Sequence, residues 1–260
     1  MLDASATPTL RLGDTEVLRI GLGTNRLTGA PGHVAFLREA VRAGVGHIDT
    51  AHLYTRGQSE ETIGAGLAPF PSGCVVATKG GYAAGEGRPE ALRAQIEESL
   101  RRLRADSIAL WYLHRVDPQT PFEETLGAIK EHRDRGLIRH VGLSQVRRDQ
   151  IERAGEVVPI TAVQNHYNLS ERGSEDVVDY CADQGIVFVP FFPLRGGGGP
   201  RLEEIAEGHG ATPAQITLAW LLKRSPTTLP IPGTLSIEHL KENLAALRIE
   251  LSESEFDALR

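Results

Sequence analysis

The chain has 260 residues, a length close to the ~250 residues of one typical (β/α)8 barrel, although two domains of ~100–150 residues would also fit. Its formal net charge of −6 argues against a nucleic-acid or anionic-membrane partner, because such partners are bound through clustered cations. No apolar run approaches the ~18–20 residues of a membrane span, and the N-terminal MLDASATPTL lacks the basic and apolar regions of a secretory signal.

Strand-like and helix-like segments alternate along almost the whole chain. The segment TLRLGDTEVLRI has two alternating runs around Gly13-Asp14, which predicts an N-terminal β-hairpin. Eight short, nearly continuous apolar runs then predict strands that are buried on both faces, as in a parallel sheet covered by helices. They lie at 19–23, 47–51, 74–79, 107–114, 139–144, 160–165, 186–192 and 227–232.

Amphipathic segments with helix start signals separate these strands. Residues 89–103 carry apolar side chains on one face and charges on the other. Capping sequences at Thr120, Thr212 and Ser252 predict three further helix starts. Eight strands alternating with helices, without a linker, predict a single domain over 1–260. Its expected fold class is α/β, a (β/α)8 TIM barrel whose N-terminal β-hairpin closes the bottom of the barrel.

Polar residues stand at or just beyond the ends of the early strands. Asp49 lies in HIDTA, Tyr54 follows five residues later, Lys79 ends CVVATK and His114 ends IALWYLH. The carboxyl ends of barrel strands meet on the face that holds the active site, so we expect these four side chains to lie together. A carboxylate, a phenol, an ammonium and an imidazole form a proton-transfer set.

Each of the four also has a plain structural interpretation. Taken singly, Lys79 would be a solvated lysine, Tyr54 a packing residue, Asp49 a helix cap and His114 a structural histidine. The chain has 24 arginines and only 4 lysines, and lysine differs from arginine in that its pKa is readily tuned. An ammonium beside Tyr54 would lower the phenol pKa from ~10, with Asp49 holding the ammonium in place. The joint order of the four favours the catalytic interpretation.

The sequence resembles the aldo-keto reductase superfamily over nearly its whole length. The resemblance is carried by GLGT at 21–24, IDTAHLYT, ATKGG, YLH, HVGLSQ at 140–145, VQNHYNL at 163–169, VPFFPL at 189–194 and IPGTLSIEHLKEN at 231–243. It implies a barrel that binds NADPH across its C-terminal face and reduces aldehydes or ketones. In that scheme Tyr54 is the general acid, Lys79 and Asp49 lower its pKa, and His114 orients the carbonyl. A weaker resemblance points to the bacterial group that includes pyridoxal reductases.

The same resemblance implies a set of cofactor contacts. Ser144, Gln145 and Gln164 align with the group that grips the nicotinamide carboxamide, and Phe191 aligns with the aromatic residue that stacks on the ring. Gly196 begins a glycine run that would approach the pyrophosphate, although such a run is also typical of a flexible surface loop. The full implied set is Gly23, Thr24, Asn25, Asp49, Ser144, Gln145, Gln164, Phe191, Phe192, Pro193, Leu194, Arg195, Gly196, Ile231, Pro232, Gly233, Thr234, His239, Glu242 and Asn243.

Three features depart from the family pattern. Gln145 stands where asparagine is common, and its longer arm would shift the carboxamide contact. Gly233 and His239 stand where a lysine and an arginine usually meet the 2′-phosphate, which weakens the charge argument; NADPH is favoured and NADH is the alternative. Arg115 follows His114 in place of an aromatic residue, which implies a different pocket wall. Arg115 would either meet an anionic substrate or be an exposed loop residue.

The segments 80–88, 115–120 and 195–201 should line a pocket that is open to solvent, since little chain follows the last predicted helix. We expect a small-molecule carbonyl substrate, no nucleic-acid or membrane partner, and a monomer or weak homo-oligomer. Cys74 and Cys181 should be reduced, buried thiols of a cytoplasmic protein.

Two other classes of function fit parts of the sequence. A cofactor-binding regulatory or redox-sensing relative with little turnover would keep the same cofactor contacts. A metal-dependent barrel hydrolase would need converging ligands, but no HxH or HExxH spacing occurs, so no metal site is predicted. Turnover of carbonyl compounds with NADPH separates the reductase from both.

Overall fold

The computed structural model describes residues 8–260. Residues 1–7 lie outside the described residues. They include the start of the predicted domain and most of the N-terminal stretch in which no secretory signal is predicted. The strands are β1 (Thr9–Leu12), β2 (Thr15–Leu18), β3 (Leu22–Gly23), β4 (His47–Asp49), β5 (Val75–Gly80), β6 (Ile108–Leu113), β7 (Ile138–Ser144), β8 (Ile160–Gln164) and β9 (Val187–Phe188). The helices are α1 (His33–Arg42), α2 (Gln58–Leu67), α3 (Pro89–Leu103), α4 (Phe122–Asp134), α5 (Arg148–Gly155), α6 (Glu175–Gln184), α7 (Pro200–Gly208), α8 (Pro213–Arg224), α9 (Ile237–Ala245) and α10 (Glu253–Ala258), with 3-10 turns η1 (Tyr54–Gly57) and η2 (Ala246–Arg248).

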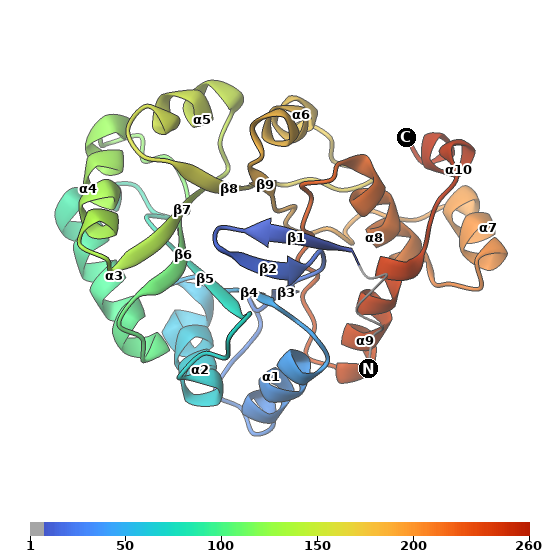
Figure 1. Ribbon diagram of the computed structural model, residues 1–260, viewed down its shortest axis with the longest axis horizontal. Coiled ribbons are helices and arrows are strands. Elements are labelled where there is room, and N and C mark those ends of the chain that lie inside the picture. The colour runs from blue at the N-terminus through green and yellow to red at the C-terminus, as the bar shows by residue number, and fades with distance from the viewer. Residues whose placement is uncertain (1–7) are drawn as a thin grey trace.

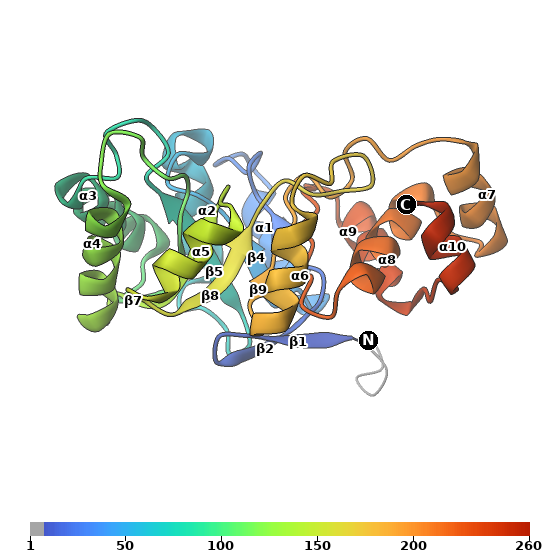
Figure 2. The same cartoon turned by 90° about the horizontal axis from the view of Figure 1, so that it is seen from above.

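The strands β3 to β9 form one parallel sheet in chain order, and β1 pairs with β2 as a separate antiparallel hairpin. The sheet curls round with helices on its outer side, and the hairpin lies across one end (Figure 1). In the perpendicular view the hairpin runs along the lower edge of the molecule, opposite the long loops at the top (Figure 2). The predicted α/β barrel with an N-terminal hairpin is confirmed.

The barrel closes through an irregular segment rather than an eighth strand. The predicted strand 227–232 forms only isolated contacts: the Leu229 N–H donates to Phe188 O at 2.8 Å, and the Gly21 N–H donates to Pro230 O at 3.0 Å. Proline has no N–H, so two alternate positions of this segment cannot donate to a ladder. The prediction of a regular strand at 227–232 is therefore wrong, although the segment does lie between β9 and β3.

The other predicted strands are present with altered bounds. Those at 19–23 and 186–192 shrink to the two-residue strands β3 and β9. The remaining five shift by up to two residues at either end. Predicted helix 89–103 is confirmed as α3, and the capping boxes at Thr212 and Ser252 are confirmed at the starts of α8 and α10. The predicted cap at Thr120 is wrong, because its hydroxyl instead donates to Asp117 at 2.7 Å.

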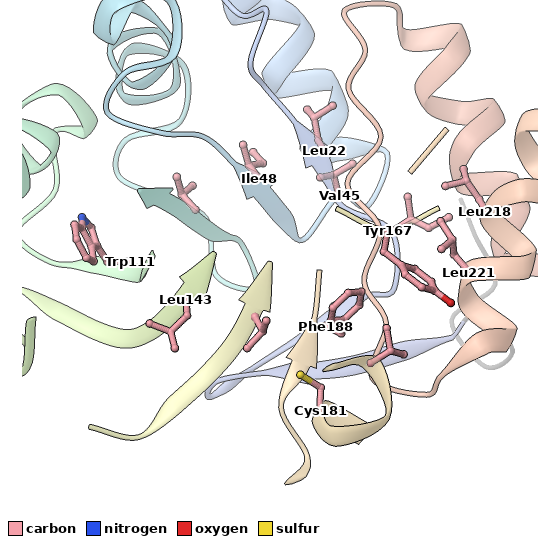
Figure 3. Packing of buried hydrophobic residues seen from close by; sticks show 14 of the residues in the cluster. Leu22, Val45, Ile48, Trp111, Leu143, Tyr167, Cys181, Phe188, Leu218 and Leu221 are labelled. Carbon is pink, nitrogen blue, oxygen red and sulfur yellow. The ribbon is translucent and has the colours of Figure 1, made fainter. Parts of the chain in front are cut away.

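Two apolar clusters hold these elements. The larger one fills the layer between sheet and helices, and it includes Ile48 of β4, Leu143 of β7 and Leu218 of α8 (Figure 3). The smaller cluster fills the barrel interior, where Leu12 and Val17 of the hairpin pack with side chains from the strands. Burying each such side chain contributes about 1.5–3 kcal/mol. The hairpin thus plugs the bottom of the barrel with apolar residues, which leaves the opposite end for polar ones.

Two further observations bear on the sequence predictions. Within residues 8–260, no helix has the length and apolar character needed to cross a membrane. Cys181 is a buried free thiol on α6, as expected. Cys74 is also free but only half-buried, and it precedes β5 instead of lying inside a strand.

Candidate active site

The strand pattern itself places the polar set. Along β5, Val75 and Ala77 face the barrel interior, and a period of two places Lys79 on the same inner side one step further on. His114 follows β6 in the same way, and Asp49 is the last residue of β4. All three therefore emerge at the carboxyl ends of neighbouring parallel strands, as predicted.

Lys79 and Asp49 form a fully buried ion pair. The Lys79 ammonium donates to Asp49 Oδ1 at 2.7 Å and to Thr50 O at 2.8 Å, while Gln164 Nε2 donates to the second carboxylate oxygen at 2.8 Å. Burial lowers the pKa of Lys79, but Asp49 and Tyr54 raise it by more, so the ammonium stays charged. Breaking such a pair would strand a buried charge, which typically costs about 3–5 kcal/mol.

Tyr54 stands beside this pair. Its hydroxyl lies 3.4 Å from Lys79 Nζ, and the ammonium lies 4.9 Å from the centre of its ring. Burial raises the pKa of Tyr54, and Lys79 lowers it by less, while the Asp49 carboxylate raises it further. Lys79 therefore lowers this pKa as expected, although burial outweighs it, whereas the lowering expected of Asp49 is wrong. Asp49 fixes the ammonium but repels phenolate, and the phenol keeps its proton at neutral pH.

His114 completes the set as a neutral imidazole. Its ring lies 6.1 Å from the Tyr54 ring and 4.9 Å from the Tyr82 ring, measured between centroids. Burial, Lys79 and Arg115 lower the pKa of His114 to about 3. Its Nδ1 is buried and has no hydrogen-bond partner within residues 8–260. A neutral ring can donate one hydrogen bond to a substrate oxygen without adding charge.

The turn that carries Tyr54 has an unusual backbone. Thr55, Arg56 and Gly57 have φ values of 48°, 58° and 89°, so three consecutive residues are left-handed and two of them are not glycine. Such residues cost of order 1–3 kcal/mol each and persist only where surrounding contacts hold them. One such contact is the Thr55 hydroxyl, which donates to Leu27 O at 2.7 Å.

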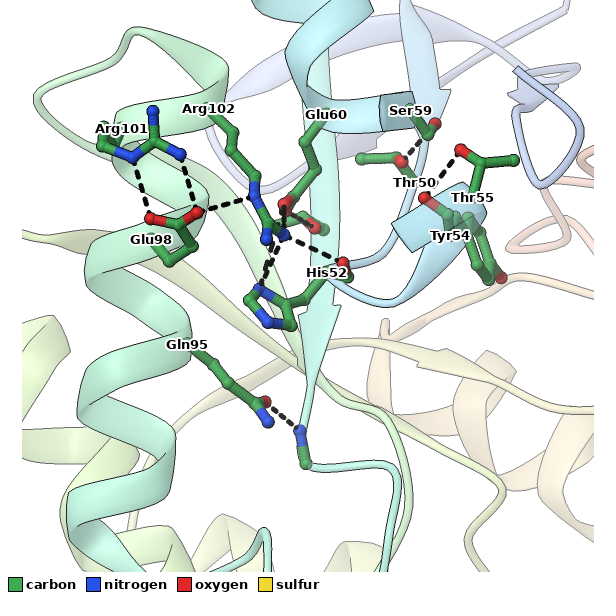
Figure 4. Close-up of polar contacts among 12 residues, drawn as sticks. Thr50, His52, Tyr54, Thr55, Ser59, Glu60, Gln95, Glu98, Arg101 and Arg102 are labelled. Carbon is green, nitrogen blue, oxygen red and sulfur yellow. Dashed lines mark hydrogen bonds and ion pairs between the residues drawn. The ribbon is translucent and has the colours of Figure 1, made fainter. Parts of the chain in front are cut away.

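A buried ion pair behind this turn supplies further contacts (Figure 4). Arg102 of α3 donates through Nη1 to Glu60 Oε2 of α2 at 3.2 Å and to the His52 carbonyl at 3.1 Å. The other oxygen of Glu60 accepts from the Thr78 hydroxyl at 2.6 Å, one residue before Lys79. A β-carbon at Gly57 would lie 2.4 Å from Arg102 Cζ, so glycine leaves the space that the guanidinium occupies. The cluster thus ties the turn that bears Tyr54 to the strand that bears Lys79.

A cavity of about 560 Å³ opens above these residues. Most of the predicted site residues line it. They are Gly23, Thr24, Asn25, Asp49, Tyr54, His114, Ser144, Gln145, Gln164, Phe191, Phe192, Pro193, Leu194, Arg195, Ile231, Pro232 and Gly233. Tyr82, from the predicted wall segment 80–88, also lines it, whereas the predicted wall segment 115–120 contributes no lining residue. Lys79 lies behind Asp49 and is completely buried.

Two lining residues, Arg26 and Leu53, are absent from the sequence prediction. Each directly adjoins a predicted residue, Asn25 or Tyr54, so extending those motifs by one position would have found them. Arg26 is exposed and donates to the carbonyl oxygen of Gly233, another lining residue, at 2.7 Å.

Five predicted cofactor residues do not line this cavity: Gly196, Thr234, His239, Glu242 and Asn243. Glu242 is engaged elsewhere, since it accepts from the Thr212 hydroxyl at 2.6 Å and from Gln215 through its carbonyl at 3.0 Å. Gly196 O accepts from the Ser170 hydroxyl at 2.5 Å. Their role as cofactor contacts stays a prediction.

Metal-binding side chains do not gather in the described part of the chain. Within residues 8–260, no group of three or more His, Cys, Asp or Glu side chains is arranged to hold a metal ion. That the protein binds no metal ion stays a prediction.

The structure is a parallel barrel that carries an ammonium, a carboxylate, a phenol and an imidazole at the carboxyl ends of its strands. The sequence model of the aldo/keto reductase family matches residues 19–260, and the chain belongs to this family.

Its relatives cover nearly its whole length. Pyridoxine 4-dehydrogenase from Escherichia coli is 38% identical over an alignment of 278 positions, and the alignment covers 96% of this chain and 96% of that one. The solved structure of the thermostable aldo-keto reductase Tm1743, in complex with the inhibitor epalrestat, has a TM-score of 0.89 at 36% identity and covers 96% of this chain and 98% of that one. An aldo-keto reductase from Klebsiella pneumoniae in complex with NADPH has a TM-score of 0.88 at 30% identity, over 97% of this chain and 94% of that one.

Proposed function

We propose that this protein is an NADPH-dependent carbonyl reductase in which Tyr54 is the general acid. The observation that carries the proposal is the arrangement of Tyr54, Lys79 and His114 at the floor of the cavity. A protonated phenol stands next to a buried ammonium, and a neutral imidazole faces the same space. This set can protonate an oxygen and hold it in place, but it contains no group that donates a hydride, so a cofactor must supply one.

The lining of the cavity fits a nicotinamide nucleotide. Ser144 and Gln164 offer a hydroxyl and an amide for a carboxamide, and Phe191 offers an aromatic face beside them. At the mouth, Arg26 and Arg195 present two guanidinium groups for phosphate oxygens. These residues would hold the cofactor, with its ring next to Tyr54 and its phosphates toward the arginines. NADPH in the Klebsiella pneumoniae relative supports this choice over NADH.

Bound NADPH supplies the hydride that forms a new C–H bond at the carbonyl carbon. Tyr54 donates its phenolic proton to the carbonyl oxygen, so the products are an alcohol and NADP⁺. Lys79 stabilises the phenolate left behind, and its own charge is balanced by Asp49 at 2.7 Å. His114 donates a hydrogen bond that orients the carbonyl. Solvent then returns a proton to Tyr54, whose raised pKa favours the protonated form.

The Tyr54→Phe variant tests the proposal, because it removes one hydroxyl and keeps the ring. We expect the purified protein to oxidise NADPH in the presence of aldehydes or diketones, and the variant to lose on the order of 10²–10⁴-fold in kcat. Binding of NADPH, measured by protein fluorescence, should be unchanged in the variant. Full activity of Tyr54→Phe would show that another group is the acid.

The same assay separates the reductase from a cofactor-binding regulatory protein. Tight NADPH binding without turnover of any aldehyde, ketone or diketone in the panel would favour the regulatory alternative. A matched control is Tyr180→Phe, because this tyrosine stacks with Arg148 on the outer helices, away from the cavity.

A further inference from the structure

An exposed arginine beside the cavity contacts two of the residues that line it. Arg115 follows His114 at the end of β6 and lies over the Tyr82 ring, with its Cζ 4.7 Å from the ring centre. Its Nη2 donates to Gln145 Oε1 at 3.1 Å. Tyr82 and Gln145 both line the cavity. Arg115 is exposed and does not itself line the cavity, but its contacts with two lining residues place its guanidinium next to the cavity.

Gln145 connects this arginine to the centre of the site. Its amide nitrogen donates to the His114 carbonyl at 3.1 Å, while its amide oxygen accepts from Arg115. Gln145 is also one of the few non-glycine residues with a left-handed backbone, at φ 57°. The longer arm that distinguishes Gln145 from asparagine is thus used to span Arg115 and His114. Two departures from the family pattern, at positions 115 and 145, form one contact.

The acidic side chains of the neighbouring loops, Glu86 and Asp117, bind loop groups and form no ion pair with Arg115. Glu86 accepts from the backbone N–H groups of Tyr82 and Ala83 at 3.0 and 2.9 Å. Asp117 accepts from the N–H groups of Gly85, Gly87 and Gln119, and from Thr120. Both carboxylates are therefore occupied by the loops on which they stand. Within residues 8–260, Arg115 makes no ion pair.

The cavity as a whole has a positive mouth on a chain of net charge −6. Arg26 and Arg195 line it, and neither of them forms an ion pair with any of the described residues. The one acidic side chain that lines it, Asp49, is balanced by Lys79. Arg26 and Arg195 adjoin the segments assigned to the cofactor, whereas Arg115 directly follows His114, which is assigned to the substrate.

We propose that Arg115 determines specificity by binding an anionic oxygen group, a carboxylate or a phosphate, on the carbonyl substrate. This inference rests on the proposed function. Stacking on Tyr82 and the bond to Gln145 fix the plane of the guanidinium, and its remaining N–H groups can donate to two oxygens of one anion. The substrate class is then an aldehyde or ketone with an acidic group at the end away from the reacting carbon.

The experiment compares matched pairs of substrates with and without the charge. Succinic semialdehyde is compared with its methyl ester, and glyceraldehyde phosphate with glyceraldehyde, so the two pairs also distinguish a carboxylate from a phosphate. The quantity measured is the ratio of kcat/KM for the charged substrate to that for the uncharged one, in the native protein and in Arg115→Gln. A ratio cancels any general effect that Arg115 has on His114.

We expect Arg115→Gln to lower this ratio roughly ten- to a hundredfold for one of the two pairs, through KM rather than kcat. Arg115→Lys, which keeps the charge and loses the planar fork, should fall between the two. Arg42→Gln on α1, an exposed arginine outside the cavity, is the matched control and should leave the ratio unchanged. An equal ratio in the native protein and Arg115→Gln, for both pairs, would overturn the proposal.

A binding measurement keeps this inference separate from the proposed reaction. Succinate and inorganic phosphate are titrated calorimetrically into the protein with NADP⁺ present, in the native chain and in Arg115→Gln. Weaker binding to the variant supports the anion site even if no aldehyde is reduced, in which case the proposed function alone fails. Equal binding to both proteins counts against Arg115 whatever the activity.

Discussion

The cavity has two unlike walls. On the β4–β6 side, Asp49, Lys79 and His114 are buried and fixed by side chains that contact one another. On the β9–α7 side, the wall is a loop after β9 in which Phe192 is 41% exposed and Arg195 stacks on its ring, with 4.2 Å from Cζ to the ring centre. The first wall is rigid before anything binds, as proton transfer requires. The second offers backbone and exposed groups that can adapt to a long cofactor.

The two walls also use left-handed backbone differently. At Thr55 and Arg56, side chains occupy this region, and the contacts of Arg102 and Thr55 hold the turn in place. In the loop after β9, Phe192 is also left-handed at φ 52°, but the other such positions are Gly196 and Gly199, where glycine adopts the conformation without strain. The turn beside Tyr54 therefore places two consecutive side chains in this region, whereas the loop after β9 places one there and otherwise uses glycine.

Among the comparisons of the two walls, the largest effect should come from removing Arg102, whose contacts support the turn that bears Tyr54. Arg102→Met leaves the completely buried Glu60 without its cation, and should cost up to about 3–5 kcal/mol in the free energy of unfolding. Because the turn that bears Tyr54 loses its anchor, kcat should also fall about 10- to 100-fold. Chemical denaturation and steady-state kinetics at a temperature where the variant is folded measure the two effects.

Arg101→Met is the matched control for this prediction. Arg101 is the next residue on the same helix, but its side chain is 66% exposed, against 15% for Arg102. Its ion pair with Glu98 is at the surface, where such pairs contribute about 0–1 kcal/mol. A similar loss of kcat in both variants would mean that Arg102 does not position the turn.

A pair of glycine substitutions compares the two walls through smaller expected changes in stability and kcat. Gly57→Ala forces a side chain onto a residue with φ 89° and against Arg102, so it should cost about 1–3 kcal/mol and lower kcat. Gly198→Ala places its β-carbon in open space and should change stability by less than about 0.5 kcal/mol. Any effect at Gly198 should fall on the KM for NADPH. Equal losses in the two variants would remove the distinction between the walls.

The rigid wall was partly predictable from the sequence for a physical reason. Asp49, Lys79 and His114 are polar residues at the ends of buried parallel strands, where a polar side chain has no place except the active-site end of the barrel. Tyr54 was predicted from its place just beyond the strand that contains Asp49, and the resemblance then gave it the role of general acid. Its exact position was not predictable, because it depends on a turn built from Thr55 and Arg56, and neither residue type signals a left-handed backbone.

Other features of the site were out of reach of the sequence. Arg102 belongs to the charged face of an amphipathic helix, and periodicity does not tell a solvated arginine from one that reaches a neighbouring turn. The sign of the pKa shift of Tyr54 depends on burial outweighing Lys79, which only coordinates reveal. The segment 227–232 has the apolar character of a strand, but its prolines prevent a regular ladder.

The smallest expected effect is that of pH on kcat, which reports on the buried wall that carries Tyr54 and His114. Reduction needs Tyr54 protonated, a state present below its pKa and lost as pH rises through it. Because burial raises the pKa of Tyr54 above 10.0, this loss should lie beyond the neutral range. The pKa of His114 is lowered to about 3, so its ring stays neutral in the same range. We therefore expect kcat for an uncharged aldehyde, with both substrates saturating, to be flat from about pH 5 to about pH 9.

The exposed wall should respond to pH where the buried one does not. The 2′-phosphate of NADPH titrates near pH ~6, and the exposed arginines Arg26 and Arg195 face the cavity mouth. The Kd for NADPH should therefore rise as pH falls below about 6, while kcat stays constant. Activity regained on return to neutral pH is the control for unfolding. The opposite outcome would be a change of kcat between pH 6 and pH 7 that is absent in His114→Gln. It would show that the imidazole titrates during turnover and that the buried wall is not insulated from solvent.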